Sequence, residues 1–252
     1  MENSLYEDWA AYRLLFPTDE ESLLFYRAVT NGCQRILDAG CGPGDLAQLL
    51  ESENRLVVGV DLVQPPPGPG SLVRGDLLRL PFGDGSFDGV VSRLFGVAYA
   101  AGVGRAAPLQ VAAELARVSA EGARFALELP VAWRPHRLQG LEESTPIIGG
   151  FHYRFRYLDE LERNAFGSVL QTSIVLSRDS EVYSVDAPLQ VFTPDGAGAW
   201  FDAANADIEG FCAPYDLGTL TKEPPADCLR AVVYGSRRGG GGAAAPSTVA
   251  NG

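Results

Sequence analysis

Leu37-Asp38-Ala39-Gly40-Cys41-Gly42-Pro43-Gly44-Asp45 is the stretch of this sequence that decides its fold. The run at 35–39 is short and apolar and predicts a buried strand, whereas residues 45–53 predict a helix. Glycine allows a sharp turn between the two, and a side chain at Gly40 or Gly42 would keep a ligand away from the backbone. The stretch therefore predicts a nucleotide-like ligand at the carboxyl end of a sheet.

Three carboxylates define which nucleotide this turn can accept. The dinucleotide pattern G-x-G-x-x-G would need a glycine at position 45, where Asp45 would instead repel a pyrophosphate from the helix start. Asp61 ends the second predicted strand, where it can accept hydrogen bonds from both ribose hydroxyls. Asp76 follows the third strand and can accept one from an adenine amino group. The set predicts an adenosine without a phosphate.

Strands and helices alternate along the first half of the chain and predict an α/β fold. Such alternation is typical of a doubly wound, mostly parallel sheet with right-handed crossovers and helices on both faces. A weak helix that begins at Thr193-Pro194-Asp195 and two later strands complete a seven-stranded sheet. The predicted strands are 35–39, 55–61, 71–74, 87–93, 124–129, 207–213 and 228–236, and the helices 45–53 and 108–118 lie between them.

The first thirty residues are predicted to be helical. Thr18 and Glu21 have the spacing of a capping box, so a helix should begin at Thr18 and run towards Val29. Before it, aromatic residues recur at three- and four-residue spacing and share one helix face. This face fits either core packing or a lid; its members are Tyr6, Trp9, Tyr12 and Phe16.

After Pro130 the pattern changes to strands in succession. Aromatic side chains at Phe151, Tyr153, Phe155 and Tyr157 alternate with His152, Arg154 and Arg156, which predicts a half-buried strand. Residues 170–176 and 183–191 alternate in the same way and predict an antiparallel meander inserted after the fifth strand. A competing interpretation makes 158–164 the last core helix and 169–176 the sixth strand.

The motifs, taken in order, resemble those of class I S-adenosylmethionine-dependent methyltransferases. The glycine turn at 37–44 is similar to their first motif, and the similarity continues through Gly59-Val60-Asp61, Gly75-Asp76-Leu77 and residues 80–88. It covers residues 6–129 and resumes from 193 to 237. The insertion resembles that of members which act on small molecules, amino sugars among them, where it shapes the substrate cavity or a dimer contact.

The resemblance implies the cofactor S-adenosyl-L-methionine, with S-adenosyl-L-homocysteine as its product, and a role for each matching residue. Asp38, Gly40 and Gly42 would line the methionine part, and Arg93 and Leu94 would border its end. Tyr6 and Tyr12 would close over the cofactor. The ribose would be held by Asp61, and the adenine by Leu62, Asp76 and Leu77. We expect one methyltransferase domain at 1–238, with a lid at 1–30, the insertion at 131–192 and a disordered tail at 239–252.

The expected reaction is an in-line transfer of a methyl group to a nitrogen or oxygen nucleophile of a small molecule, such as a secondary metabolite. A base is needed only where the nucleophile must lose a proton, and the candidates are His136, Glu128 and His152. The candidates for the wall of an apolar substrate pocket are Phe95, Tyr99 and Trp133. A cofactor-binding relative that transfers no methyl group, or an NAD-linked oxidoreductase, are the alternatives.

The composition excludes several other classes of function. A net charge of −12 disfavours nucleic acid, and Ser92-Arg93-Leu94-Phe95 replaces the motif typical of base methylation. The single lysine, Lys222, leaves no P-loop and sits in no apolar pocket for a Schiff base. Two histidines and four cysteines without a C-x-x-C pair predict no metal site. With neither a signal peptide nor a membrane span, we expect a cytoplasmic protein with free thiols. The insertion could also form the contact of a homodimer.

Overall fold

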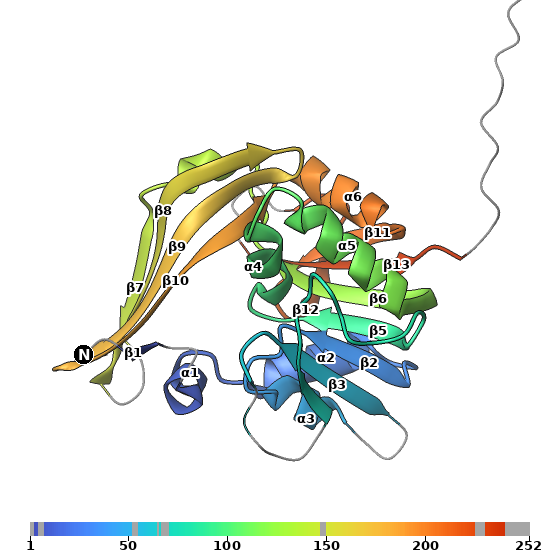
Figure 1. Cartoon of the computed structure of the whole chain (residues 1–252), viewed down its shortest axis with the longest axis horizontal. Coiled ribbons are helices and arrows are strands. Elements are labelled where there is room, and N and C mark those ends of the chain that lie inside the picture. Colours follow the sequence, from blue (N-terminus) through green and yellow to red (C-terminus); the bar gives the residue numbers. More distant parts are fainter. Residues whose placement is uncertain are drawn as a thin grey trace, which may run out of the picture.

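The fold is described from a computed structural model, which covers residues 3–4, 8–51, 55–64, 66, 71–146, 150–224 and 230–239. Tyr6, Cys228 and the expected tail from residue 240 onward lie outside these ranges. Two sheets organise the chain, one of eight strands and one of five (Figure 1). None of the helices in the described ranges is both long enough and apolar enough to cross a membrane.

The eight-stranded sheet has the order β12-β11-β13-β6-β5-β2-β3-β4. Its strands from β4 to β6 run parallel, whereas β13, β11 and β12 each pair antiparallel with their neighbour. The predicted α/β class with a mostly parallel sheet is therefore confirmed. The strands are β2 (Arg35–Ala39), β3 (Leu56–Asp61), β4 (Ser71–Arg74), β5 (Phe87–Ser92), β6 (Ser119–Leu129), β11 (Ala206–Ala213), β12 (Asp216–Thr221) and β13 (Ala231–Arg237).

The strand count differs from the prediction, because the sheet has eight strands where seven were expected. The additional strand is β12, an edge strand that folds back on β11 after a turn at Tyr215, whose φ is 66°. Its sequence contains Asp216 and Gly218, residues that are depleted in strands. Pairing with β11 outweighs this weak propensity, so the strand forms without a clear local signal.

Helices cover both faces of this sheet, as the alternation predicted. On one face α2 (Glu20–Val29) and α3 (Asp45–Leu50) pack around Tyr26 and Leu46. On the other, α4 (Gly96–Gly102), α5 (Ala107–Val118) and α6 (Pro194–Ala203) pack around Val111 and Trp200. The sequence did not reveal α4, because the helix is short and both its first and its last residue are glycine, which favours helix weakly.

Of the two predicted helix caps, one lies one residue away from its predicted position and the other is confirmed. The capping residue of α2 is Asp19 rather than Thr18: its Oδ1 accepts from the backbone N–H of Ser22 at 2.8 Å. Thr193 caps α6 as predicted, since its hydroxyl accepts from the N–H of Gly196 at 2.9 Å, and Pro194 follows it. A one-residue shift at α2 is possible because Asp is as good a cap as Thr.

The second sheet has the order β1-β10-β9-β8-β7 and forms an arch beside α4 (Figure 1). The three long strands pair antiparallel in succession, which confirms the predicted meander, and residues 158–164 belong to β8 rather than to a helix. Gly102 of α4 approaches this sheet so closely that a Cβ there would lie 2.6 Å from the carbonyl oxygen of Pro188. The strands are β1 (Asn3–Ser4), β7 (Glu142–Pro146), β8 (His152–Asn164), β9 (Gly167–Arg178) and β10 (Glu181–Phe192).

The N-terminal helix α1 (Trp9–Leu15) is attached to the start of α3 by an ion pair. The guanidinium of Arg13 donates to both carboxylate oxygens of Asp45, at distances of 2.8 to 3.0 Å. Asp45 is predicted from the sequence only to repel a phosphate; in the structure it also holds α1 over the glycine turn.

Candidate functional site

Three cavities meet where the parallel strands end and the five-stranded sheet begins. The large cavity measures about 430 Å³, the aromatic pocket about 170 Å³ and the narrow slot about 20 Å³. Tyr12 and Leu94 line all three, so they stand at the junction. The large cavity contains eight of the predicted cofactor residues: Tyr12, Gly40, Gly42, Asp61, Leu62, Asp76, Leu77 and Leu94.

The glycine turn begins where β2 ends and needs glycine for two different reasons. At Gly40 a Cβ would lie 2.7 Å from the Cα of Gly96, so the turn and the start of α4 pack backbone against backbone. At Gly42, with φ at 54°, a Cβ would stand 3.5 Å from the ring of Tyr12. The turn is fixed to β3 by the N–H groups of Gly40 and Cys41, which donate to the carbonyl of Val60 at 2.9 and 3.0 Å.

Asp61 lies at the end of β3 and connects the turn to the large cavity. Its Oδ2 accepts from the N–H of Gly42 at 2.8 Å, and its Oδ1 accepts from the N–H of Val63 at 3.0 Å. Partial burial raises the pKa of the carboxyl, while these backbone hydrogen bonds act against the rise. Each carboxylate oxygen keeps a lone pair that can accept from a hydroxyl group in the cavity.

The residues predicted to hold an adenine lie at the other side of the large cavity. Asp76 is exposed, and its Oδ1 accepts from the N–H of Leu78 at 2.9 Å, so it also caps its own turn. Leu77 is buried, whereas the side chain of Leu62 is 65% exposed and forms part of the rim. The arrangement offers one acceptor at an edge and apolar surface beside it, which suits a flat heterocycle.

Asp38 is a buried carboxylate that lines the narrow slot together with Gly40 and Arg93. Among the described residues, none makes a hydrogen bond to its Oδ2. Burial raises its pKa to about 7, although the positive charge of Arg93 acts in the opposite direction. A positively charged group in the slot would satisfy this oxygen and would stabilise the ionised form.

Arg93 follows β5 and attaches the connection between α1 and α2 to the sheet. Its guanidinium donates to the hydroxyl of Thr18 at 3.0 Å, to the carbonyl of Pro17 and to the phenol oxygen of Tyr215 at 3.1 Å. This connection places Phe16 beside Tyr12 in the wall of the narrow slot and of the aromatic pocket. Arg93 therefore lines the slot and also fixes the connection between α1 and α2.

The backbone is strained at the junction of the cavities. Leu94 and Phe95 are consecutive non-glycine residues with φ at 52° and 64°. Such left-handed conformations cost free energy and persist where surrounding contacts enforce them, which occurs often at functional sites. The strain turns Leu94 towards the large cavity and lets Phe95 line the aromatic pocket.

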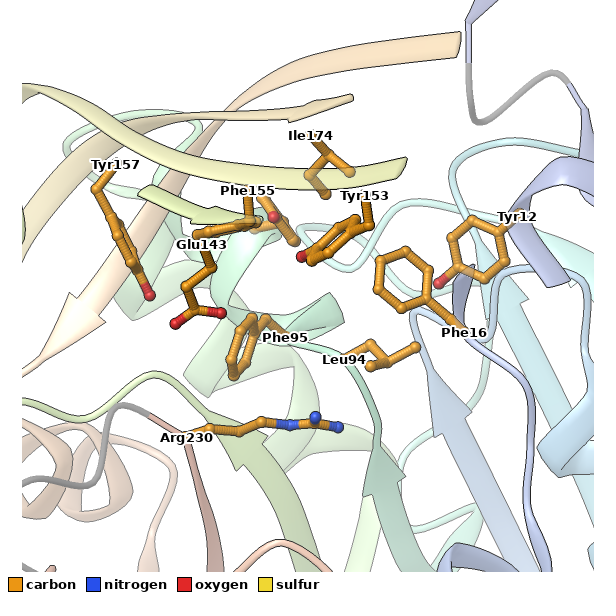
Figure 2. Close-up of a pocket in the computed structure, with 11 residues that line it drawn as sticks. Tyr12, Phe16, Leu94, Phe95, Glu143, Tyr153, Phe155, Tyr157, Ile174 and Arg230 are labelled. Atoms are coloured by element: carbon orange, nitrogen blue, oxygen red, sulfur yellow. The ribbon is translucent and has the colours of Figure 1, made fainter. Parts of the chain in front are cut away.

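The aromatic pocket lies between the two sheets (Figure 2). The inner face of β8 supplies Tyr153, Phe155 and Tyr157, and the opposite wall contains Phe95 and Tyr99, both predicted substrate residues. Burial raises the pKa of Tyr99 to about 12, so its phenol stays protonated at neutral pH. The alternation in the sequence predicts the aromatic face of β8 but not that this face lines a pocket. No sequence signal places the other lining residues Phe16, Glu143, Ile174 and Arg230 in the pocket.

Glu128, one of the candidate bases, is fully buried within β6 and engaged by two partners. The guanidinium of Arg230 donates to its Oε1, and the phenol of Tyr215 donates to its Oε2 at 3.1 Å. Arg230 also donates to the oxygen of Tyr215 at 2.9 Å. In this arrangement the carboxylate balances the charge of Arg230 instead of facing the pocket.

The other three predicted acceptor-side residues lie on the surface. His136 is exposed in the 3-10 helix η2 (Pro135–Leu138), and His152 is exposed on the outer face of β8. The side chain of Trp133 is 49% exposed. None of the three lines the large cavity, the aromatic pocket or the narrow slot.

Comparison with known proteins shows which family a part of the chain resembles. A family model described as a methyltransferase domain matches residues 37–127, the segment from the glycine turn through β6. This segment is therefore similar to a methyltransferase domain. The resemblance in the motifs is thereby confirmed. No curated protein sequence matches the chain.

Solved structures with methyltransferase activity share the fold over nearly the whole chain. An S-adenosylmethionine-dependent methyltransferase from Clostridium acetobutylicum is 14% identical, with a TM-score of 0.66, and the match covers 94% of this chain and 100% of that one. A sugar N-methyltransferase from a Streptoalloteichus species is 19% identical, with a TM-score of 0.64 and coverage of 95% and 96%. An amino pentose methyltransferase of calicheamicin biosynthesis from Micromonospora echinaspora, with S-adenosylmethionine bound, is 20% identical, with a TM-score of 0.60 and coverage of 94% and 98%.

Proposed function

We propose that this protein is an S-adenosyl-L-methionine-dependent methyltransferase that acts on a nitrogen or oxygen nucleophile of a small molecule. The observation that carries the proposal is the junction at Tyr12 and Leu94, where a cavity lined by Gly40, Asp61 and Asp76 meets an aromatic pocket. One side of this junction suits a nucleoside and the other suits an apolar acceptor. Two substrates can therefore face each other across it.

The described residues fit the cofactor in both charge and shape. Asp61 would accept from the ribose hydroxyls and Asp76 from the adenine amino group, while Leu62 and Leu77 cover the heterocycle. In the narrow slot, the unsatisfied Oδ2 of Asp38 suits the ammonium of the methionine part, and Arg93 suits its carboxylate. Tyr12 and Tyr6 would close over the cofactor.

The contribution of the protein to the reaction is alignment in a dry site. When bound, the cofactor supplies a methyl group on a sulfonium, which needs no further activation. The rings of Phe95, Tyr99 and Tyr153 exclude water and orient the acceptor, so much of the acceleration comes from proximity. His136, His152 and Glu128 do not line the pocket, which favours an acceptor whose nucleophile needs no base among them; Trp133 would act only at the outer rim.

The same contacts support a proposal for the domain limits. We propose that residues 1–238 act as one methyltransferase domain, in which 1–30 form the lid and 131–192 form the cap over the acceptor. The ion pair of Arg13 with Asp45 and the hydrogen bonds of Arg93 to the lid support the first assignment. The contribution of β8 to the aromatic pocket supports the second.

The acceptor class is proposed from the similar structures. Two of them act on sugars, one as a sugar N-methyltransferase and one as an amino pentose methyltransferase. We therefore propose an intermediate of secondary metabolism as the acceptor. Incubation with labelled cofactor and a panel of amines, phenols and amino sugars would test it through the release of S-adenosyl-L-homocysteine.

Titration calorimetry separates the proposed function from its alternatives. We expect binding of S-adenosyl-L-methionine and no binding of NAD. Binding of NAD alone would favour the oxidoreductase and would overturn the proposal. Binding of S-adenosyl-L-methionine with no methyl transfer to any acceptor in the panel would favour the passive cofactor-binding relative.

Two further proposals concern the oligomeric state and the cellular location of the protein. We propose that the insertion can form a homodimer contact through its outer face, where Glu142 pairs with Arg154 and Arg156; sedimentation equilibrium would show the mass of one chain if this is wrong. We also propose a cytoplasmic location, since the free thiols of Cys33 and Cys41 suit a reducing compartment, and cell fractionation tests it.

A further inference from the structure

The aromatic pocket contains one carboxylate that the proposed function does not use. Glu143 lies on β7, where its Cα pairs with that of Phe155, so its side chain shares the inner face of the sheet. Its neighbour Glu142 points the other way and forms ion pairs with Arg154 and Arg156 on the outer face. Both glutamates are exposed, but they lie on opposite faces of the strand and only Glu143 lines the pocket.

Figure 2 shows the carboxylate of Glu143 reaching into the pocket between the rings of Tyr157 and Phe95. Within the described part of the chain, Glu143 has neither an ion pair nor a hydrogen bond. Seven of the eleven residues that line the pocket are aromatic: Tyr12, Phe16, Phe95, Tyr99, Tyr153, Phe155 and Tyr157. A carboxylate without a partner among aromatic rings is an arrangement that attracts a cation.

The other charged residue of the lining does not cancel this preference. Arg230 faces the pocket, but its guanidinium donates to the buried carboxylate of Glu128 and to the phenol of Tyr215. The charge of Glu128 offsets that of Arg230, which leaves the pocket with the negative charge of Glu143. The phenol of Tyr157 lies close enough to be affected by this charge: its pKa is raised first by burial and then by the negative charge of Glu143.

We propose that the acceptor is a cation, a small molecule whose protonated amine is held by the carboxylate of Glu143 within the aromatic lining. This inference rests on the proposed function, whose acceptor it narrows to amine-bearing molecules. Glu143 is a binding residue that determines specificity. The nucleophile is another group of the same molecule, or this amine once its proton has passed to the carboxylate of Glu143. Tyrosine and phenylalanine faces stabilise the cation, and Glu143 directs it.

The test compares three probes of similar shape and different charge: 2-phenylethylamine, 2-phenylethanol and 3-phenylpropanoate. Their affinities are measured by calorimetry on the full-length protein saturated with S-adenosyl-L-homocysteine. We expect the amine to bind about tenfold more tightly than the alcohol, with the carboxylate weakest. Glu143→Gln should abolish the preference, and Glu142→Gln, the same change one residue away on the outer face, should retain it.

Three results would overturn the inference: equal binding of amine and alcohol to the unaltered protein, no binding of any probe, or a preference that persists in Glu143→Gln. Binding of S-adenosyl-L-homocysteine is measured first in every variant. Its failure would count against the proposed function, whereas a failed charge preference with intact cofactor binding would count against Glu143 alone. If 3-phenylpropanoate binds more tightly than the amine and the alcohol, the acceptor is anionic and the inference is wrong.

Discussion

At the scale of single residues, the site depends on how each carboxylate is satisfied. Asp61 is held by two backbone N–H groups, Glu128 is paired with Arg230, and Asp38 has an oxygen without a hydrogen bond among the described residues. A buried polar atom without a partner costs free energy that a ligand can recover. We therefore propose a binding role for Asp38 and Asp61 and a structural role for Glu128.

Asp61→Ala should weaken the binding of S-adenosyl-L-methionine by about 1–3 kcal/mol, because two ribose hydroxyls lose a charged acceptor. Calorimetry measures the affinity, and circular dichroism checks the fold. Asp84→Ala is the matched control, since Asp84 is exposed and pairs with Arg117 away from the cavities. Unchanged affinity in a folded Asp61→Ala protein would remove Asp61 from the site.

The raised pKa of Asp38 predicts pH dependence in binding. Its pKa is about 7 because burial disfavours the charge, so a cationic group in the slot binds better as the pH rises through 7. We expect the affinity for S-adenosyl-L-methionine to increase between about pH 6 and 8 in the unaltered protein. In Asp38→Asn this component should vanish, and identical pH profiles for the two proteins would contradict the assignment.

The same shift predicts the sign of a stability effect. The folded pKa of Asp38 lies above its ordinary value of 3.8, so between these two values the folded state holds a proton that the unfolded state has lost. This residue therefore lowers the free energy of unfolding as the pH rises from about 4 to 7. Binding of a cationic ligand opposes that loss.

At the scale of elements, the close contact between α4 and β10 fixes the distance between the two sheets. Gly102 packs against the backbone at Pro188, and α4 also supplies Tyr99 to the large cavity and to the aromatic pocket. Two cavities therefore share one helix whose position depends on a glycine. The strained Leu94 and Phe95 begin the same helix.

Gly102→Ala should destabilise the protein by about 1–3 kcal/mol, because the new methyl group would lie 2.6 Å from a carbonyl oxygen. Urea denaturation measures the change. Gly104→Ala is the control, since a Cβ there meets nothing within 4 Å, and it should leave the stability within about 0.5 kcal/mol. Equal effects of the two substitutions would mean that α4 and β10 are not in close contact.

At the scale of the whole molecule, a ligand that fills the large cavity should stabilise every element that surrounds it. The strand ends of the eight-stranded sheet, the lid and β10 all contribute to that cavity. Binding to the folded state alone stabilises it by mass action. The effect should therefore appear in the unfolding of the whole chain.

S-adenosyl-L-homocysteine at one hundred times its Kd should stabilise the protein by about 2.7 kcal/mol, which corresponds to a rise in Tm of roughly 5–10 °C. Differential scanning calorimetry measures the shift, and NAD at the same concentration serves as the control. A shift with NAD and none with S-adenosyl-L-homocysteine would be incompatible with the proposed function.

The lining of the large cavity could be predicted from the sequence, because its signals are local. A glycine turn between a strand and a helix, with Asp61 and Asp76 at the ends of the next strands, can be found from spacing and periodicity alone. Parallel strands bring their carboxyl ends to one edge of the sheet, so residues far apart in sequence share a site by topology. The lining of the large cavity by these residues follows from that rule.

Only the tertiary structure showed which residues come together in the aromatic pocket. Periodicity shows that Tyr153, Phe155 and Tyr157 share a face, but it does not tell which part of the molecule that face meets. Glu143 and Arg230 carry no motif, and their place in one pocket depends on how the five-stranded sheet packs beside α4. Turns and strand ends are specified by neighbouring residues in the chain, whereas the contact between two sheets depends on packing across the whole fold.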